Sequence, residues 1–186
     1  LIVQQSDRLL DLPLPALIGR HQIVNAGTAV AAALALRGMA APSAGSPSAA
    51  TRGLSERAIE RGLTAAAWPA RMQRLVCGPL VAMLGPDAEL WLDGGHNAAA
   101  GEALAQTLAD LEERAPQPLH LVVGMMGQKD AGGFLAPFCG LARSVITVPV
   151  PAAHEAPHAP ETLPRVTPNC LTTLRCTSEI VTLTIT

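Results

Sequence analysis

Apolar residues recur at helical spacing in several stretches of the chain. The predicted helices cover residues 21–40, 56–62 and 98–115, with a further one near 133–142. Ser55 stands directly before the second helix and has the form of its N-cap. In residues 98–115 the leucines fall on one stripe and the acids elsewhere, which predicts a helix that buries one face.

Short apolar runs predict strands between these helices, at residues 1–5, 80–84, 89–92, 119–123 and 145–150. The turn at residues 85–87 (Gly-Pro-Asp) would join the second and third strands as a hairpin-like pair. Strands alternating with helices favour an α/β fold with a Rossmann-like, mostly parallel sheet, in which ligands bind beyond the carboxyl ends of the strands. Two loops stand at such ends, residues 93–97 and residues 124–130.

Composition narrows the class of protein. With 49% hydrophobic and only 2% aromatic residues, the chain predicts a globular core packed from small aliphatic side chains. Its net charge of -2 offers no electrostatic basis for binding nucleic acid or an anionic membrane surface. No apolar run approaches the roughly 20 residues of a membrane span, and no secretion signal is visible. We therefore expect a cytoplasmic protein that is a monomer when complete.

The cysteines and the last residues add two expectations. The spacings of Cys77, Cys139, Cys170 and Cys176 match no zinc pattern, which favours reduced and mostly buried thiols. Residues 157–186 lack periodicity, and we interpret them as an atypical tail, more readily explained by a frameshift than by a genuine domain edge. The β-prone residues 180–186 could still pair as an edge strand.

The most informative motif is residues 93–97, Asp-Gly-Gly-His-Asn, which closes an apolar run and opens a helical pattern. Glycine lets a ligand approach the main chain, and a helix start offers N–H groups to anions. Alone, this signal is weak, because ordinary loops use the same residues. Two further motifs precede it, at residues 19–26 (Gly-Arg-His-Gln-Ile-Val-Asn-Ala) and 67–71 (Ala-Trp-Pro-Ala-Arg).

In this order the three motifs resemble the folylpolyglutamate synthase/dihydrofolate synthase family of the Mur ligase superfamily, whose patterns are HQxxNA, WPGR and DGAHNP. The resemblance covers roughly residues 10–155. Ala70 stands where the family has glycine, and Ala98 where it has proline. Because alanine disfavours left-handed backbone, we predict a negative φ at Ala70.

The resemblance implies an ATP-dependent, amide-forming ligase of folate biosynthesis and one-carbon metabolism. Such an enzyme uses ATP and Mg²⁺ to join L-glutamate to a folate or pteroate carboxylate through an acyl phosphate. The P-loop pattern GxxxxGK[ST] is absent from this sequence, and the metal ligands of the family lie earlier in its chains. We therefore expect a C-terminal part of the enzyme that is inactive in isolation and holds no metal ligand.

In this interpretation residues 1–69 end the central ATP-binding domain, and residues 70–156 form most of a Mur-ligase-like C-terminal domain. Two alternatives stay open: a peptidoglycan Mur-type amino-acid ligase, and an inactive truncated remnant. The sequence also leaves open whether the parent enzyme makes dihydrofolate, extends polyglutamate or does both.

The resemblance places ATP contacts at three residues. Asn25 matches an asparagine that contacts adenine, Arg71 a contact to phosphate, and Asp93 a contact to the nucleotide. Each has a structural alternative. Asn25 could bond within its helix start, Arg71 could be a solvated linker residue, and Asp93 could cap the next helix.

Three more residues are candidate contacts to phosphate or glutamate, namely His96, Asn97 and Lys129. For His96, a purely structural role is as well supported as a contact to a ligand. Lys129, the only lysine, stands in a glycine-containing loop, where a solvated pair with Asp130 is the favoured alternative. No catalytic residue is assigned.

Overall fold

The computed structural model describes residues 1–5, 8–39, 54–126, 128–148 and 181–185. The chain divides into two compact units, Leu1–Ala67 and Trp68–Thr186. Residues 41–53, predicted as a loop, and most of the predicted tail lie outside the described residues. The assignment of the units to particular domains stays a prediction.

The first unit packs two helices with a small antiparallel hairpin. Strand β1 (Ile2–Gln5) pairs with β2 (Arg8–Asp11), and the helices are α1 (Arg20–Met39) and α3 (Glu56–Ala65). The core of this unit is made of apolar residues from β2, α1 and α3 and from the segment just after β2. They are Leu10, Leu12, Ala26, Val30, Ile59 and Leu63. The predicted cap of α3 is confirmed, since Ser55 Oγ accepts a hydrogen bond from the Ala58 N–H at 3.2 Å.

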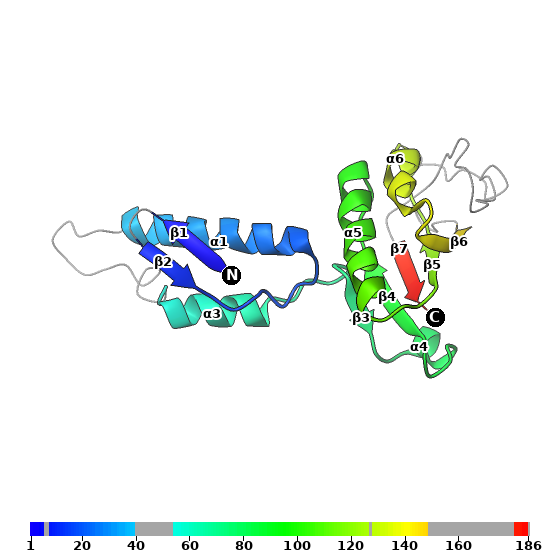
Figure 1. Cartoon of the computed structure of the whole chain (residues 1–186), viewed down its shortest axis with the longest axis horizontal. Coiled ribbons are helices and arrows are strands. Elements are labelled where there is room, and N and C mark those ends of the chain that lie inside the picture. The colour runs from blue at the N-terminus through cyan, green and yellow to red at the C-terminus, as the bar shows by residue number, and fades with distance from the viewer. Residues whose placement is uncertain (6–7, 40–53, 127, 149–180, 186) are drawn as a thin grey trace. The chain divides into compact units, whose positions relative to one another are not determined.

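The second unit is built on a five-stranded sheet in the order β3-β4-β7-β5-β6 (Figure 1). The strands are β3 (Gln73–Leu75), β4 (Glu89–Asp93), β5 (Leu119–Val123), β6 (Ala142–Thr147) and β7 (Val181–Ile185). Strands β5 and β6 pair in parallel, whereas β3–β4, β4–β7 and β5–β7 are antiparallel pairs.

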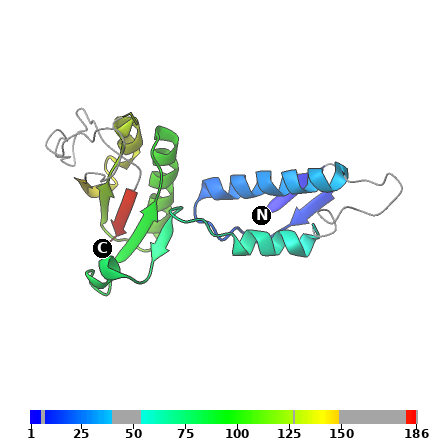
Figure 2. The ribbon, with the colours of Figure 1, turned by 180° about the vertical axis from the view of Figure 1, so that it is seen from behind.

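A mixed α/β fold with a parallel strand pair is thus confirmed, but the described sheet is mixed and not mostly parallel. The physical reason is the position of β7. It enters between β4 and β5 and runs against both, although β4 and β5 themselves run in the same direction. The C-terminal strand was predicted at an edge and instead lies at the centre of the sheet, which Figure 2 shows from behind.

Helix α5 (Ala98–Arg114) supplies much of the core of the second unit. Its buried positions fall on one stripe, namely Gly101, Leu104, Ala105, Thr107 and Leu108. The leucines and Ala105 of this stripe belong to one buried cluster with Trp91, Leu121 and Val123 of the sheet. Gly101 has a packing reason, because a Cβ there would overlap the carbonyl oxygen of Phe134. Glycine therefore lets α5 lie against the backbone of α6 (Ala131–Leu135).

Two predicted elements differ in the structure. Residues 80–84, predicted as a strand, contribute instead to the short helix α4 (Pro79–Ala82), and the antiparallel partner of β4 is β3. Proline at the first helical position favours this helix, because its fixed φ suits a helix start. The helix predicted near residues 133–142 is α6 followed by a single 3-10 turn, η1 (Ala136–Phe138), after which Gly140 turns the chain at φ 81°.

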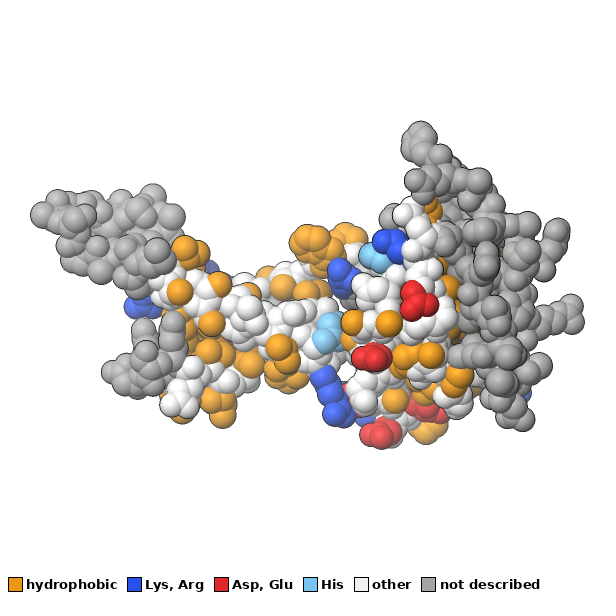
Figure 3. All heavy atoms as spheres, turned by 90° about the horizontal axis from the view of Figure 1, so that it is seen from above, with side chains coloured by type: hydrophobic (Ala, Val, Ile, Leu, Met, Phe, Trp, Pro, Cys, Tyr) orange, Lys and Arg blue, Asp and Glu red, His pale blue; other side chains and the backbone are white. Residues whose placement is uncertain are grey.

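The surface differs from expectation in one respect. Cys77 and Cys139 are free, as expected, but both are exposed and not buried. Several large hydrophobic side chains are also exposed, and hydrophobic atoms are visible along the surface in Figure 3. No helix within the described ranges is long and apolar enough to cross a membrane.

Candidate functional site

Two of the three sequence motifs are joined by hydrogen bonds in the structure. The Gly94 N–H donates to the Ala70 carbonyl at 2.9 Å, and the Met72 N–H donates to Asp93 Oδ2 at 2.8 Å. These bonds continue the β3–β4 pairing, whose last paired residues are Gln73 and Leu92. The turn that contains Arg71 is therefore fixed against the end of β4.

Asp93 is the central residue of this arrangement. Its side chain is buried, and its other carboxylate oxygen, Oδ1, accepts from the Gly95 N–H at 2.7 Å. Each oxygen thus binds one backbone donor from a different turn, which meets the requirement that a buried charge be hydrogen-bonded. Each oxygen keeps a second lone pair, so these bonds do not prevent a contact to the nucleotide. That contact stays a prediction.

The alternative reading of Asp93 as the cap of the following helix is wrong. Asn97 is the N-cap of α5, and its Oδ1 accepts from the Ala100 N–H at 2.9 Å. An asparagine just before an alanine run is a recognisable cap signal, so the sequence contained this role. The predicted ligand contact of Asn97 must compete with that bond.

The negative φ predicted for Ala70 is also wrong. Ala70 has φ 53° and Met72 has φ 44°, so two non-glycine residues on either side of Arg71 adopt left-handed backbone. Such conformations cost of order 1–3 kcal/mol each and persist only where surrounding bonds enforce them. Here the enforcing bonds are those to Asp93 and Gly94, together with the Ala70 N–H that donates to Gln73 Oε1 at 3.0 Å.

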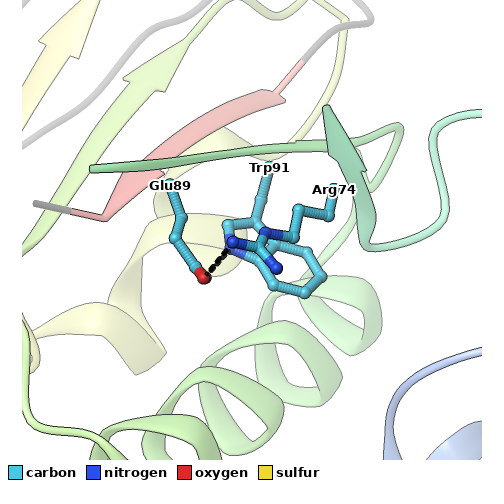
Figure 4. Close-up of polar contacts among 3 residues, drawn as sticks. All are labelled: Arg74, Glu89 and Trp91. Atoms are coloured by element: carbon cyan, nitrogen blue, oxygen red, sulfur yellow. Dashed lines mark hydrogen bonds and ion pairs between the residues drawn. The ribbon is translucent and has the colours of Figure 1, made fainter. Parts of the chain in front are cut away.

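Arg71 has an exposed side chain, and its guanidinium makes no hydrogen bond or ion pair with any residue that the structure describes. Arg74, three residues later, differs (Figure 4). It pairs with Glu89 Oε1 at 2.7 Å, while the Trp91 indole N–H donates to Glu89 Oε2 at 3.0 Å. Of these two arginines, Arg71 is the one that a phosphate or carboxylate could engage without breaking an existing ion pair.

His96 lies half-buried in the turn before α5. Its Nδ1 is 3.0 Å from the Gly94 carbonyl oxygen, which can only accept, so Nδ1 carries a proton. In the neutral ring Nε2 is then an acceptor, suited to an ammonium or amine N–H. Only the protonated ring could donate from Nε2 to a phosphate.

The two predicted ligand loops lie at the same edge of the sheet. Asp93 of β4 and Val123 of β5 are both paired with Val181 of β7, so the loops that follow begin about two strand spacings apart, roughly 9.5 Å. The first turn of α5 has no acidic residue of its own that would occupy the positive end of the helix dipole.

Lys129 is half-buried in the second of these loops, beside the start of α6. Asp130 caps α6 through its Oδ1, which accepts from the Gly133 N–H at 2.9 Å. A Cβ on Gly133 would lie 3.2 Å from that of Ala98, so the first turns of α5 and α6 are neighbours. Asp130 is exposed as well as capping α6, so both readings of Lys129, the ligand contact and the solvated pair with Asp130, stay predictions.

Asn25 belongs to the first unit and is exposed on α1, where its Nδ2 donates to Gln22 Oε1 at 3.2 Å. Gln22 is buried and lies within hydrogen-bond distance of the neighbouring His21 ring. Both amides line an apolar cavity of about 410 Å³ between α1 and α3. The structural alternative for Asn25, a bond within its helix start, is therefore present, and one amide oxygen and one N–H remain for a ligand.

The structure thus brings Arg71, Asp93, His96 and Asn97 together in one unit, with Lys129 at the same sheet edge. It does not place Asn25 relative to them, so their convergence on one nucleotide stays a prediction. Sequence reasoning missed Gln73, whose spacing of three from Ala70 is its only signal. Among the described residues, no group of three or more His, Cys, Asp or Glu side chains could hold a metal ion.

Curated proteins with similar sequences all carry folylpolyglutamate synthase in their names. A probable bifunctional folylpolyglutamate synthase/dihydropteroate synthase of Halobacterium salinarum is 37% identical over 120 residues, which is 64% of this chain and 11% of that protein. A dihydrofolate synthase/folylpolyglutamate synthase of Mycobacterium tuberculosis is 35% identical over 126 residues, 68% of this chain and 22% of that protein. A folylpolyglutamate synthase of Lacticaseibacillus casei is 26% identical over 103 residues, 55% of this chain and 21% of that protein.

The resemblance predicted from the three motifs is therefore confirmed. The chain matches only 11–22% of the length of these relatives. No family model and no solved structure matches it.

Proposed function

We propose that this chain is part of an ATP-dependent ligase that joins glutamate to a folate or pteroate carboxylate through an acyl phosphate. Its similarity to proteins named folylpolyglutamate synthase favours the folate branch over a peptidoglycan Mur-type ligase. The described residues support one part of this reaction, a site for the nucleotide. The proposal extends from that site to the reaction of the whole protein.

The observation that carries the proposal is the junction of the second and third motifs at Asp93. Met72 and Asp93, which are 21 positions apart in sequence, are joined by a hydrogen bond to the buried carboxylate. The turn that results is strained on both sides of Arg71. Strained backbone held by a buried charge is a feature of binding sites, where it fixes a side chain in one orientation. Here that side chain is a guanidinium without an ion-pair partner among the described residues.

Each candidate residue then has a physical task. The planar guanidinium of Arg71 binds phosphate oxygens, and the start of α5 adds N–H donors and the positive end of its dipole. Asp93 holds both turns and accepts from a ribose hydroxyl with its remaining lone pairs. The Nε2 of His96 accepts a hydrogen bond from the amine of glutamate whenever the ring carries a single proton, and the ammonium of Lys129 draws a carboxylate or phosphate to the sheet edge.

The charge of a nucleotide suits this site, because the Arg71 guanidinium has no ion-pair partner among the described residues and the first turn of α5 carries no acidic residue. When bound, ATP supplies the phosphoryl group that activates the substrate carboxylate. Asn25 contributes an amide that matches the donor and acceptor pair of adenine. No magnesium ligand is assigned to this chain.

The test is a pair of matched arginine variants. Arg71→Ala should weaken ATP binding by about tenfold, the value of a charge-assisted hydrogen bond. Arg74→Ala removes the same group from the same segment, but its guanidinium is paired with Glu89, so ATP affinity should change by less than about twofold. Both are measured by calorimetric titration with ATP and Mg²⁺.

Loss of equal size in both variants, or no measurable ATP binding by the unaltered chain, would remove the nucleotide site from the proposal. The substrate is tested in a complete enzyme that contains this segment, by adding ATP, Mg²⁺ and glutamate with either a reduced folate or a peptidoglycan precursor and following amide formation. We expect no turnover from this chain alone, because the P-loop pattern is not in its sequence. Product formed only with the peptidoglycan precursor would contradict the folate assignment.

A further inference from the structure

The central strand of the second unit is connected to the rest of the sheet in an unusual way. Strand β7 pairs over five residues with β4 on one side and over five residues with β5 on the other. In the described sheet, β4 and β5 do not pair with each other, so β7 alone links the β3–β4 hairpin to the β5–β6 pair (Figure 1).

The space that β7 fills is one strand wide and is defined by other elements. The registers align β4 and β5 position for position, since Trp91 and Leu121 share the partner Leu183. Helix α5 shares one buried cluster with both flanking strands, to which β4 contributes Trp91 and β5 contributes Leu121 and Val123. Two strands with one strand between them lie roughly 9.5 Å apart, and an α-helix is about 10 Å across, so one helix can cover both.

We propose that β4 and β5 form a strand-binding slot whose width is set by the packing of α5, and that the C-terminal strand of this chain occupies it as a separable insert. The occupant is bound through main-chain hydrogen bonds on both edges, as in strand addition, so a peptide with the sequence of residues 180–186 should bind in trans. This inference does not depend on the proposed function, because it concerns backbone pairing alone.

Occupation of the slot also bears on the candidate site. Val181, the first residue of β7, is paired with both Asp93 and Val123, the last residues before the two ligand loops. An empty slot would leave the ends of β4 and β5 without a shared partner at the edge where the loops begin. The insert therefore stabilises the spacing between those loops.

The first experiment measures amide hydrogen exchange in the unaltered full chain. Amides in the β4–β7 and β5–β7 ladders should exchange together, through an opening that leaves the β5–β6 ladder protected. If all these ladders exchange at one rate through global unfolding, β7 is an integral strand and the proposal is wrong.

The second experiment uses Leu183→Pro in the full chain, which removes one N–H from the middle of β7. Exchange of the β4 and β5 amides that pair with β7 should rise by at least about tenfold, while the β5–β6 ladder stays protected. Adding the peptide of residues 180–186 should restore protection, and the same peptide carrying Leu183→Pro should not. A folded variant with unchanged exchange, or one that the unaltered peptide fails to protect, would overturn the proposal. If the variant does not fold, the exchange pattern of the unaltered chain decides.

Discussion

The backbone at Ala70 offers a sharp test of the site geometry. An alanine at φ 53° is in left-handed conformation, which brings Cβ close to the following carbonyl oxygen. The family resembled here has glycine at this position, and glycine adopts that conformation without the clash. Ala70→Gly should therefore stabilise the second unit, although glycine usually destabilises a folded protein.

The magnitude follows from two opposing terms. Removing the Cβ relieves roughly 1–2 kcal/mol of steric strain at a left-handed residue. Glycine also makes the unfolded chain more flexible, which costs about 0.5–1 kcal/mol. The difference is a net gain of roughly 0–1.5 kcal/mol, centred on about 0.75 kcal/mol. Little burial is lost, because the Ala70 side chain is a single methyl group and only half-buried.

The matched control is Ala136→Gly, in the same unit. Ala136 is exposed and has φ -52°, so the control has no strain to relieve and should lose about 0.5–1 kcal/mol. The free energy of unfolding is measured in urea by the fluorescence of buried Trp91, with Trp68→Phe as the common background. Equal destabilisation by both glycines would show that Ala70 has ordinary backbone, and the account of the turn would be wrong.

Three further variants test other parts of the second unit. Gly101→Ala should destabilise it by about 2 kcal/mol or more, because the new Cβ overlaps the Phe134 carbonyl. The control Gly62→Ala places its Cβ in open space on α3 and should be neutral or stabilising in the same thermal melt. Equal effects of the two variants would contradict the α5–α6 packing. Asn97→Ala should lower the unfolding free energy by about 1 kcal/mol and Asn97→Ser by much less, since serine still caps; equal losses would exclude a capping role. Asp93→Asn should cost about 1–3 kcal/mol in urea unfolding, because the amide NH₂ faces a backbone donor that the carboxylate oxygen accepted; an unchanged midpoint would refute the two bonds.

Periodicity predicted the longer elements of this fold well. Helix α5 differs from its prediction by one residue, and β5 was predicted with its observed bounds, because both combine a regular apolar pattern with clear flanking residues. The short elements were harder. Residues 80–84 are apolar enough for a strand, and only Pro79 signals the helix start that forms.

Long-range pairing could not be predicted from local patterns. The β-prone character of residues 180–186 was visible, but the choice between edge and centre depends on the edges that β4 and β5 leave free. Likewise, the left-handed conformation of Ala70 depends on bonds from Asp93 and Gly94, some 20 residues away. A residue's own propensity cannot report a constraint that distant backbone groups impose.

The same long-range bonds decide which variant can test the nucleotide site. The resemblance alone suggests Asp93→Ala as a test that leaves the fold intact. In the structure that change would leave the buried N–H groups of Met72 and Gly95 without their acceptor, at about 1–3 kcal/mol each. The turn around Arg71 would then relax, so lost ATP binding could reflect either a missing ribose contact or a displaced guanidinium. Arg71→Ala removes an exposed group with no partner among the described residues, and its effect on ATP affinity therefore measures ligand binding alone.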